Sequence, residues 1–300
     1  MSVSLSRVFG SQSPRWTAAG AKLVCEQLID FRSVGTRPDI LVVLPYFNAE
    51  RWIDSCLAAL AANDQPHDIL IVDDGDRPAE AHVKPQDNLA ILRIEPKVGL
   101  IGALNAAATF ALDHSYAFYV RQDADDLAYP WRLATQRQLL LETNADLVFS
   151  PARAVDETGQ VLFRGTSGAI LTQDPTRALR YGNPYTHSTW FLRTSLFQRL
   201  GGYDPNFKAA EDYEFLQRIA RHGVIAMTPQ VLLDYRVHGG SATAQSLACS
   251  IATIKVQAHY FDPGQPASYL GMMRAVAAAA TPRSWKTQAR TWLSKRRSAT

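Results

Sequence analysis

The chain has 300 residues, of which 47% are hydrophobic and 20% are charged, and this composition predicts a globular protein rather than a disordered or fibrous one. No apolar run approaches the roughly 20 residues that a membrane-spanning helix needs, and the first residues lack the apolar core of a secretion signal, so we expect a cytoplasmic protein. The three scattered cysteines form neither a disulfide framework nor a zinc pattern. We expect Cys25, Cys56 and Cys249 to be small buried hydrophobes.

The net charge of +3 is unevenly distributed along the chain. Residues 283–300 carry six basic side chains and no acid, and subtracting these six charges leaves −3 on the rest of the chain. A body with an acidic balance does not offer a nucleic-acid surface, and we expect no nucleic-acid partner.

Residues 1–37 form an N-terminal leader, in which we expect one helix over 18–31. From residue 40, short apolar runs rich in β-branched residues alternate with segments of helical spacing. We predict strands at 40–44, 69–72, 89–94 and 118–121, and helices at 49–62 and 99–112. This alternation is typical of an α/β fold with a doubly wound, mostly parallel sheet flanked by helices.

The second half of the chain is less regular. We predict helices at 130–143, from about 194, and at 211–222, and strands at 146–150, 161–163 (in a hairpin) and 231–237. The change of character at residue 151 divides a nucleotide-binding half (38–150) from an acceptor half (151–245) of one domain, since no linker separates them. A helical basic tail follows at 246–300.

The predicted strand at 118–121 is followed by three carboxylates within four positions, Asp123, Asp125 and Asp126. Like charges at this distance repel one another unless a cation lies among them. Oxygen ligands at the carboxyl end of a strand suit a hard divalent ion that is shared with the phosphates of a substrate. In the alternative, one aspartate caps the next helix, near whose start Pro130 would lie, and the other two are solvated.

Four other polar clusters lie at predicted strand ends or helix starts. They comprise residues 45–48, residues 73–75, residues 211–212 and His238. Each cluster alone has an ordinary explanation, such as a tight turn or a negatively charged helix start. In this order, and alternating with buried strands, they favour one site for a diphosphate, a ribose or a metal.

Six segments, in order, resemble the motifs of the family 2 glycosyltransferases with the GT-A fold, from about residue 40 to residue 241. They are ILVVLPYFNAERWIDSCLAAL, ILIVDDGD, VGLIGALNAA, VRQDADDLAYPWRLATQ, GNPYTHSTWFLRTSLFQRLGGYDPNFKAAEDYEFLQRIARHG and YRVHGGSAT. The resemblance implies a metal-dependent, inverting enzyme that moves a sugar from a nucleotide diphosphate to a hydroxyl in the synthesis of a cell-surface glycan or polysaccharide. The expected partners are a nucleotide-diphosphate sugar and a glycan or lipid-linked acceptor.

The resemblance also implies roles for single residues at the nucleotide. Pro45, Tyr46 and Asn48 would line the base pocket, with Tyr46 stacked or packed against the base; in the alternative, these side chains only fill the core. Asp73 would hydrogen-bond the uracil or the ribose, and Asp123 would face the ribose and the metal.

At the reacting end, the resemblance implies that Asp125 holds Mn²⁺ or Mg²⁺, that His238 is the last contact to the metal or to the diphosphate, and that Asp126 caps the next helix. The cation would neutralise the leaving diphosphate as a Lewis acid. Asp212 matches the general base, which takes the proton of the acceptor hydroxyl, and Glu211 would support it. A single displacement inverts the anomeric centre, whereas a retaining route needs a nucleophilic carboxylate, for which we find no candidate.

His187 resembles the acceptor-side histidine of the family and would touch the donor sugar or the acceptor; the alternative is a satisfied core histidine. Two positions depart from the family pattern: Asp76 replaces the usual serine, and Lys97 stands where asparagine is common. Both departures lie at the nucleotide end, so they concern the donor rather than the reaction. The base, the sugar and the acceptor are set by loop shapes that the motifs do not encode.

Three alternative functions fit parts of the sequence. A receiver domain would share a strand-end acidic pair, but at its first strand and in a much shorter chain. A nicotinamide dehydrogenase needs a Gly-x-Gly-x-x-Gly turn after a strand, which this chain lacks. A nucleotide-sugar sensor would bind its ligand without turnover, and the presence of both Asp125 and Asp212 argues against it.

The tail carries no family motif. In residues 282–297, Trp285, Ala289, Trp292 and Leu293 recur at helical spacing among basic residues. Such an amphipathic helix suits an anionic membrane surface, which would place the enzyme on the inner face of a membrane beside a lipid-linked acceptor. In the alternative, the two tryptophans pack on the body.

Overall fold

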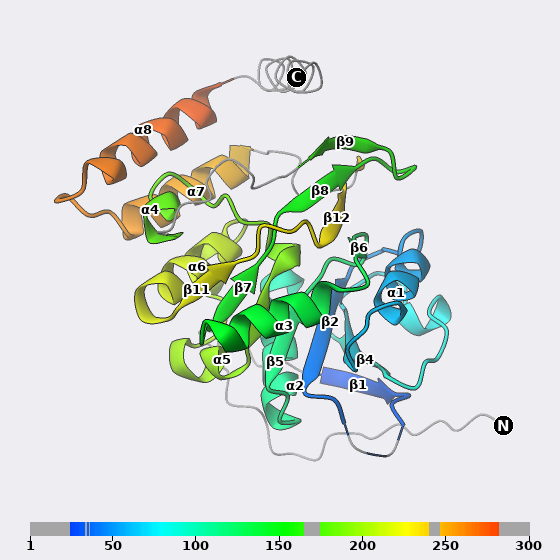
Figure 1. The fold of residues 1–300 in the computed structure, drawn as a ribbon. Coiled ribbons are helices and arrows are strands. Elements are labelled where there is room, and N and C mark those ends of the chain that lie inside the picture. The colour runs from blue at the N-terminus through cyan, green and yellow to red at the C-terminus, as the bar shows by residue number, and fades with distance from the viewer. Residues whose placement is uncertain (1–24, 34, 36, 165–174, 240–246, 282–300) are drawn as a thin grey trace.

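The computed structural model describes residues 25–33, 35, 37–164, 175–239 and 247–281, and Figure 1 shows their arrangement. An eight-stranded sheet lies at the centre. From edge to edge its strands are β1 (Cys25–Asp30), β4 (Leu89–Ile94), β3 (Asp68–Asp73), β2 (Ile40–Tyr46), β5 (Phe118–Arg121), β10 (Phe191–Arg193), β7 (Leu147–Phe149) and β11 (Ile225–Met227). Strands β4, β3, β2 and β5 are parallel, and β10 runs antiparallel between β5 and β7. The predicted mostly parallel α/β sheet is confirmed.

The parallel strands are buried on both faces, and their sequences show why. Every residue of β3 is buried, and its sequence lacks the alternation of a half-exposed strand. Successive side chains of a strand point to opposite faces, so that Val42 lies in one apolar cluster and Val43 in the other. Both clusters must therefore be covered by helices.

Helices cover the two faces of this sheet as a doubly wound fold requires. One face packs against α1 (Ile53–Ala61) and α3 (Arg132–Glu142). The opposite face packs against α2 (Gly99–Asp113), α5 (Ser195–Leu200) and α6 (Glu211–His222). Helices α2 and α6 lie where the sequence predicts them, whereas α1 and α3 begin a few residues later than predicted.

A smaller sheet connects the acidic turn to the end of the domain. Its strands, in order, are β6 (Leu127–Ala128), β12 (Leu233–Arg236), β8 (Ala152–Val155) and β9 (Val161–Arg164). Strand β12 pairs with both β6 and β8, and β8 and β9 form the predicted hairpin. Because β6 directly follows the three aspartates, β12 brings the segment after Leu233 to the acidic turn.

The division at residue 151 makes no break in the main sheet. Strand β7 precedes it, and β10 and β11 follow it, yet all three belong to the sheet that contains β5. The predicted halves, 38–150 and 151–245, share one sheet, and their separate roles remain a proposal.

The helix predicted over 18–31 is wrong where the structure describes that segment. Residues 25–30 form β1, which pairs antiparallel with β4, while residues 1–24 lie outside the described residues. Without β1, strand β4 would be the edge of the sheet, and its outward backbone N–H and C=O groups would be unpaired. Strand β1 supplies hydrogen-bond partners for these groups. Leu28 is buried in the core beneath this edge.

The C-terminal part consists of α7 (Leu247–His259) and α8 (Pro266–Ala280), which pack against each other, and Figure 1 shows α8 at the outer edge of the molecule. Cys249 in α7 is only partly buried, unlike Cys56 in α1, because a surface helix buries one side only. Within the described part of the chain, none of the helices combines the length and the apolar character needed to cross a membrane. The predicted membrane-binding segment 282–297 lies outside the described residues.

The remaining helical elements are short. They are the helix α4 (Pro175–Leu179) and the 3-10 turns η1 (Ala79–Ala81), η2 (His187–Thr189) and η3 (Pro205–Phe207).

Candidate active site

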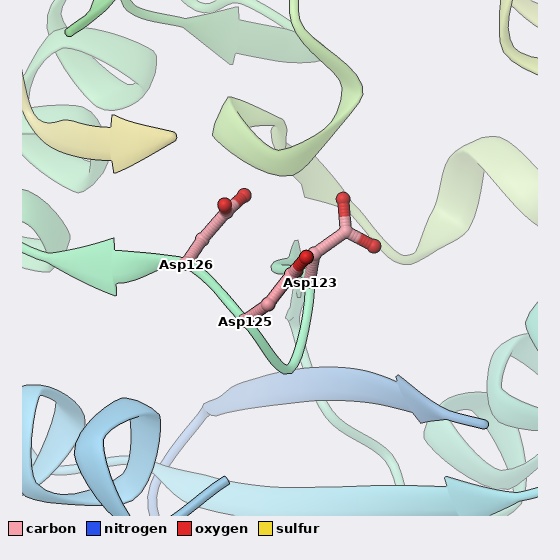
Figure 2. Close-up of side chains that lie close together, drawn as sticks. All are labelled: Asp123, Asp125 and Asp126. Carbon is pink, nitrogen blue, oxygen red and sulfur yellow. The ribbon is translucent and has the colours of Figure 1, made fainter. Parts of the chain in front are cut away.

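Three carboxylates project from one tight turn between β5 and β6. Figure 2 shows the side chains of Asp123, Asp125 and Asp126 leaving the turn on the same side. One oxygen from each lies within 4.8 Å of the others. The turn is fixed at both ends, since β5 pairs within the main sheet and β6 pairs with β12. The acidic cluster predicted from the sequence is therefore formed.

Asp123 is held by two partners inside the protein. Nη1 of Arg121 lies 2.6 Å from one carboxylate oxygen, and the hydroxyl of Ser188 donates a 2.5 Å hydrogen bond to the other. The charge of Asp123 is thus compensated by a buried guanidinium, and its carboxylate is fixed in orientation.

Asp125 and His238 are in contact, although 113 positions separate them, and their predicted role at a metal stays a prediction. Nε2 of His238 lies 2.8 Å from Oδ2 of Asp125, and the imidazole ring packs on Trp52 with 5.3 Å between ring centroids. His238 follows the end of β12, which the small sheet brings to the acidic turn. Burial and the charge of Asp123 raise the pKa of Asp125.

Asp126 does not cap the next helix, which corrects the sequence-based prediction. Helix α3 begins after Trp131, and no side chain caps its N-terminus. The carboxylate of Asp126 is instead buried, and Oδ1 accepts a 2.9 Å hydrogen bond from the backbone N–H of Arg236. Among the residues that the structure describes, no donor reaches Oδ2 of Asp126. The carboxylate of Asp126 therefore belongs to the acidic cluster rather than to a helix end.

The electrostatics of the acidic turn fit a bound cation. Burial, then the charges of Asp123 and Asp125, raise the pKa of Asp126 well above its ordinary value. A divalent ion among these oxygens would reverse that effect, because it stabilises the ionised carboxylates. Carboxylate oxygens with one imidazole are ligands that Mg²⁺ and Mn²⁺ accept. The residues present therefore fit the predicted metal.

A buried arginine to which the sequence analysis gave no role supports the acidic turn. Arg132 is fully buried in the first turn of α3. Its guanidinium donates to the side chains of Gln122 and Gln136 and to the backbone carbonyls of Arg121 and Ser188, at 2.7–3.0 Å. Arg132 thus ties the residues that precede the acidic turn to the 3-10 turn η2. Its sequence context does not distinguish it from an exposed helical arginine.

The acidic pair after β3 has a structural role in this conformation. Asp73 is buried, and its carboxylate accepts hydrogen bonds from the backbone N–H groups of Gly75 and Ala79 and from Nη1 of Arg93. Asp74 accepts from two backbone N–H groups at the start of α2. The pair shapes the loops at the nucleotide end, and the predicted contact between Asp73 and a base or ribose remains a prediction.

The aromatic residue open to a ligand at the end of β2 is Phe47 and not Tyr46. Tyr46 is 1% exposed and belongs to the apolar cluster beneath α1, whereas Phe47 is 61% exposed. The predicted stacking of Tyr46 on a base is therefore wrong for this conformation, because the alternation of the strand turns its ring into the core. Pro45 is partly buried, and Asn48 is exposed with a positive φ of 51°.

The two departures from the family pattern contact each other. Lys97 forms an ion pair with Asp76, and Asp76 also exchanges two hydrogen bonds with Asn48, at 2.7 and 3.0 Å. The ammonium of Lys97 lies 5.5 Å from the centroid of the Phe47 ring. Three loops, after β2, β3 and β4, are joined in this way beside the exposed ring. The sequence could show two unusual residues, but not that they form a pair.

Asp212 lies in the first turn of α6, beside Glu211. Nδ2 of Asn183 donates to Oδ2 of Asp212 at 2.8 Å, and the backbone N–H of Tyr213 donates to Oδ1 at 2.7 Å. Burial, followed by the negative charge of Glu211, raises the pKa of Asp212 to about 7. A carboxylate with this pKa is suited to accept a proton near neutral pH. Asn183 was missed by the sequence analysis, although it lies in one of the family-like segments.

His187 is partly buried, and its ring contacts other side chains of the protein. Its Nε2 lies 2.9 Å from the hydroxyl of Tyr203, and its ring meets Trp190 edge-on. Burial, then the charge of Arg121, lowers the pKa of His187 well below its ordinary value, so the imidazole is neutral at neutral pH. A neutral histidine can orient a hydroxyl without carrying charge.

The loop over residues 183–188 connects the acidic turn with the start of α6. Nδ2 of Asn183 donates a hydrogen bond to Asp212, and five positions later the hydroxyl of Ser188 donates one to Asp123. The buried guanidinium of Arg121 contacts both Asp123 and the hydroxyl of Ser188. The predicted metal end and the predicted base are thus linked through one loop.

The chain is similar in sequence to one protein family and to several known proteins. The model of the family described as Glycosyl transferase family 2 matches residues 41–201. An uncharacterized glycosyltransferase of Haemophilus influenzae is 22% identical over 69% of this chain and 68% of its own length. The O-antigen biosynthesis glycosyltransferase WbnJ of Escherichia coli is 26% identical over 49% of this chain, and the match spans only 59% of WbnJ.

Two solved structures share the fold. TarS of S. aureus in complex with UDP-GlcNAc matches with a TM-score of 0.58 and 17% identity, over 77% of this chain and 69% of the TarS chain. The mannosyltransferase PcManGT of Pyrobaculum calidifontis, in complex with GDP-Man and Mn²⁺, matches with a TM-score of 0.56 and 19% identity, over 87% of this chain and 74% of its own.

These matches exclude the two alternatives of a receiver domain and a nicotinamide dehydrogenase. Since the family model covers more than half of the chain and the fold agrees with it, the protein belongs to glycosyltransferase family 2 and is a glycosyltransferase with the GT-A fold.

Proposed function

We propose that the protein transfers a sugar from a nucleotide-diphosphate donor to a hydroxyl group of a glycan or lipid-linked acceptor, by one inverting displacement that depends on Mn²⁺ or Mg²⁺. The observation that carries the proposal is the link between the acidic turn and Asp212, because Ser188 and Asn183 of one loop donate hydrogen bonds to Asp123 and to Asp212. The relatives include a protein of O-antigen biosynthesis, which supports a role in the synthesis of a cell-surface glycan. We infer from the expected lipid-linked acceptor that this synthesis takes place on the cytoplasmic side of a membrane.

On the donor side, Asp125, Asp126 and His238 would hold the cation. When bound, it neutralises the negative charge that develops on the leaving diphosphate. PcManGT, whose structure contains GDP-Man and Mn²⁺, supports this assignment. Asp123, fixed by Arg121 and Ser188, would face the ribose and the metal.

The nucleotide itself would lie over the loops after β2 and β3. Pro45, Asn48 and Asp73 keep the roles that the resemblance implies. The exposed ring of Phe47 replaces Tyr46 as the surface on which a base would stack, because only an exposed ring offers a face to a ligand.

On the acceptor side, Asp212 would take the proton from the attacking hydroxyl. The new bond forms between that oxygen and the anomeric carbon as the bond to the diphosphate oxygen breaks on the opposite face. Glu211 supports the base, because its charge helps to raise the pKa of Asp212. Asn183 holds the Asp212 carboxylate in place, and His187 would touch the donor sugar or the acceptor.

The test of the metal and donor assignment measures thermal stability. The full chain is heated with UDP or GDP, each with Mn²⁺ or with EDTA, and a ligand that binds the native state raises the melting temperature. We expect a shift that needs both nucleotide and Mn²⁺, and that Asp125→Ala abolishes. The matched control is Asp54→Asn, which changes an exposed acid on α1 and should leave the shift intact. A shift of equal size with EDTA, or one that Asp125→Ala retains, would refute the metal site.

A further inference from the structure

Helix α8 is apolar on both of its faces. Of its 15 residues, Arg274 alone is charged. Ser268, Gly271 and Ala275 are buried and share one face, on which the helix packs against the body. On the other side of the helix, Tyr269, Leu270, Met273 and Val276 are between 50% and 67% exposed. A helix at the surface of a soluble protein normally has a polar outer face, so this outer face is unusual.

The outer residues form one stripe, which we name the α8 outer face. Their spacing of i, i+1, i+4 and i+7 places Tyr269, Leu270, Met273 and Val276 on one side of the helix. Contiguous exposed apolar patches mark sites of interaction with another surface. Figure 1 shows α8 at the periphery, with α7 between it and α6.

The helix cannot rotate to hide this face. A Cβ at Gly271 would lie only 1.8 Å from the carbonyl oxygen of Arg180, so the backbone of α8 is in direct contact with the body. This close approach fixes which side of the helix faces inward. The α8 outer face is therefore directed away from the core.

The charge of the surrounding chain indicates what covers the face. From residue 247 to the end there are eight Lys or Arg and one acid, Asp262, and this acid pairs with Arg180 at 3.5 Å. This part carries +7, and subtracting it from the total of +3 leaves −4 on residues 1–246. A second copy of the chain carries the same positive charge in its C-terminal part, which does not favour docking of the two copies on each other. An anionic lipid surface matches both the apolar face and the positive charge.

We propose that the α8 outer face docks on an anionic membrane surface, with Leu270 and Met273 inserted among the lipid chains and Arg274 at the level of the headgroups. The arrangement is that of a helix lying in the interface plane, with α8 parallel to the membrane. The basic residues after residue 281 add attraction to the same anionic surface. The proposal rests on the exposed apolar face of α8 and on the positive charge of the chain from residue 247 onward, and it does not depend on the sugar-transfer assignment.

The test compares full-length proteins in co-sedimentation with vesicles. One set of vesicles mixes phosphatidylglycerol with phosphatidylcholine, and the other contains phosphatidylcholine alone. The wild-type chain is expected to sediment with the anionic vesicles and to dissociate as salt is raised. The double variant Leu270→Glu, Met273→Glu is expected to bind more than about tenfold more weakly, since two inserted apolar side chains are lost and negative charge is added.

The control variant is Leu141→Glu, which places the same charge on an exposed leucine of α3 and should bind as the wild type does. Circular dichroism and melting temperature show that each variant is folded. Equal binding of the double variant and the wild type would overturn the proposal, as would a loss caused only by removal of residues 282–300. Absence of vesicle binding at low salt, or a dimer in light scattering that the double variant abolishes, would also overturn it.

Discussion

The two ends of the proposed donor site are built in opposite ways. At the metal end, Asp126 and Arg132 are fully buried, and Arg132 holds the acidic turn through four hydrogen bonds. At the base end, the side chains of Asp76 and Lys97 are 59% and 46% exposed. A buried, bonded network has one low-energy arrangement, whereas exposed side chains have many. The reacting groups are thus fixed, while the residues around the base can change without cost to the fold.

The largest effect is expected at the reacting end. Asp212→Asn keeps the shape of the side chain but removes the base, so the rate should fall by roughly 10²–10⁴-fold. Donor affinity should persist, because Asp212 lies on the acceptor side. The initial rate of UDP or GDP release measures the turnover. The melting-temperature shift with UDP or GDP measures the binding of the nucleotide. Near-normal turnover of this variant would refute the assignment of Asp212 as the base.

The buried network predicts a large effect on stability. Arg132→Met leaves the side chains of Gln122 and Gln136 and two backbone carbonyls without their donor, which should lower the free energy of unfolding by about 3–5 kcal/mol. The matched control is Arg137→Met on the same helix, where the ion pair with Asp39 is exposed and the expected loss is below about 1 kcal/mol. Urea denaturation measures both. Similar losses for the two variants would contradict the importance of burial.

The pH dependence of the reaction tests the environment of Asp212. The base acts only when ionised, and burial with the charge of Glu211 raises the pKa of Asp212 to about 7. Activity, as kcat/KM, should therefore fall about tenfold per pH unit below that pKa and level off above it. The free energy of unfolding changes with pH in the opposite direction. A carboxyl group whose pKa is raised in the folded state stabilises the fold at low pH, and this contribution is lost as the pH rises through the folded-state pKa.

The variant Glu211→Gln tests the cause of this pKa. It removes the negative charge next to Asp212 but keeps the size of the side chain. The fall of kcat/KM at acid pH should therefore begin at a lower pH than in the wild type. A fall that begins at the same pH would show that another group controls it.

The same contrast explains what the sequence could predict. Buried strands were recognisable because runs such as residues 69–72 are apolar throughout, and the acidic turn was recognisable because three carboxylates stand together. The pairing of Asp125 with His238 followed only from the resemblance, since 113 positions separate them.

Other features depend on tertiary context, which a single sequence does not carry. Residues 25–30 form a strand because β4 leaves an open edge, not because of their own pattern. Arg132 and Arg137 are alike in sequence, yet one is fully buried and the other is only partly buried. Asp126 was assigned to a helix cap because its burial by β12 could not be foreseen.

The smallest effect is expected at the base end, where the chain departs from the family pattern. Asp76→Ser and Lys97→Asn restore the residues that the pattern has there. Both side chains are largely exposed, so neither change should alter the melting temperature of the free protein. Donor affinity should change by about two- to fivefold, the range of a single exposed charge contact, because the pair joins the loops beside Phe47.

A double-mutant cycle shows whether the two departures act together. Because Asp76 and Lys97 contact each other, the effect of the double variant on the dissociation constants of UDP and GDP should differ from the sum of the single effects. Lys84→Asn, which changes an exposed lysine near the start of β4, serves as the control and should be additive with Asp76→Ser. Strict additivity for the Asp76 and Lys97 pair would mean that the ion pair does not shape the base end. Coupling that changes the ratio of the UDP and GDP affinities would identify the ion pair as a determinant of the donor nucleotide. The reacting groups, Asp125 and Asp212, would be unaffected by these substitutions.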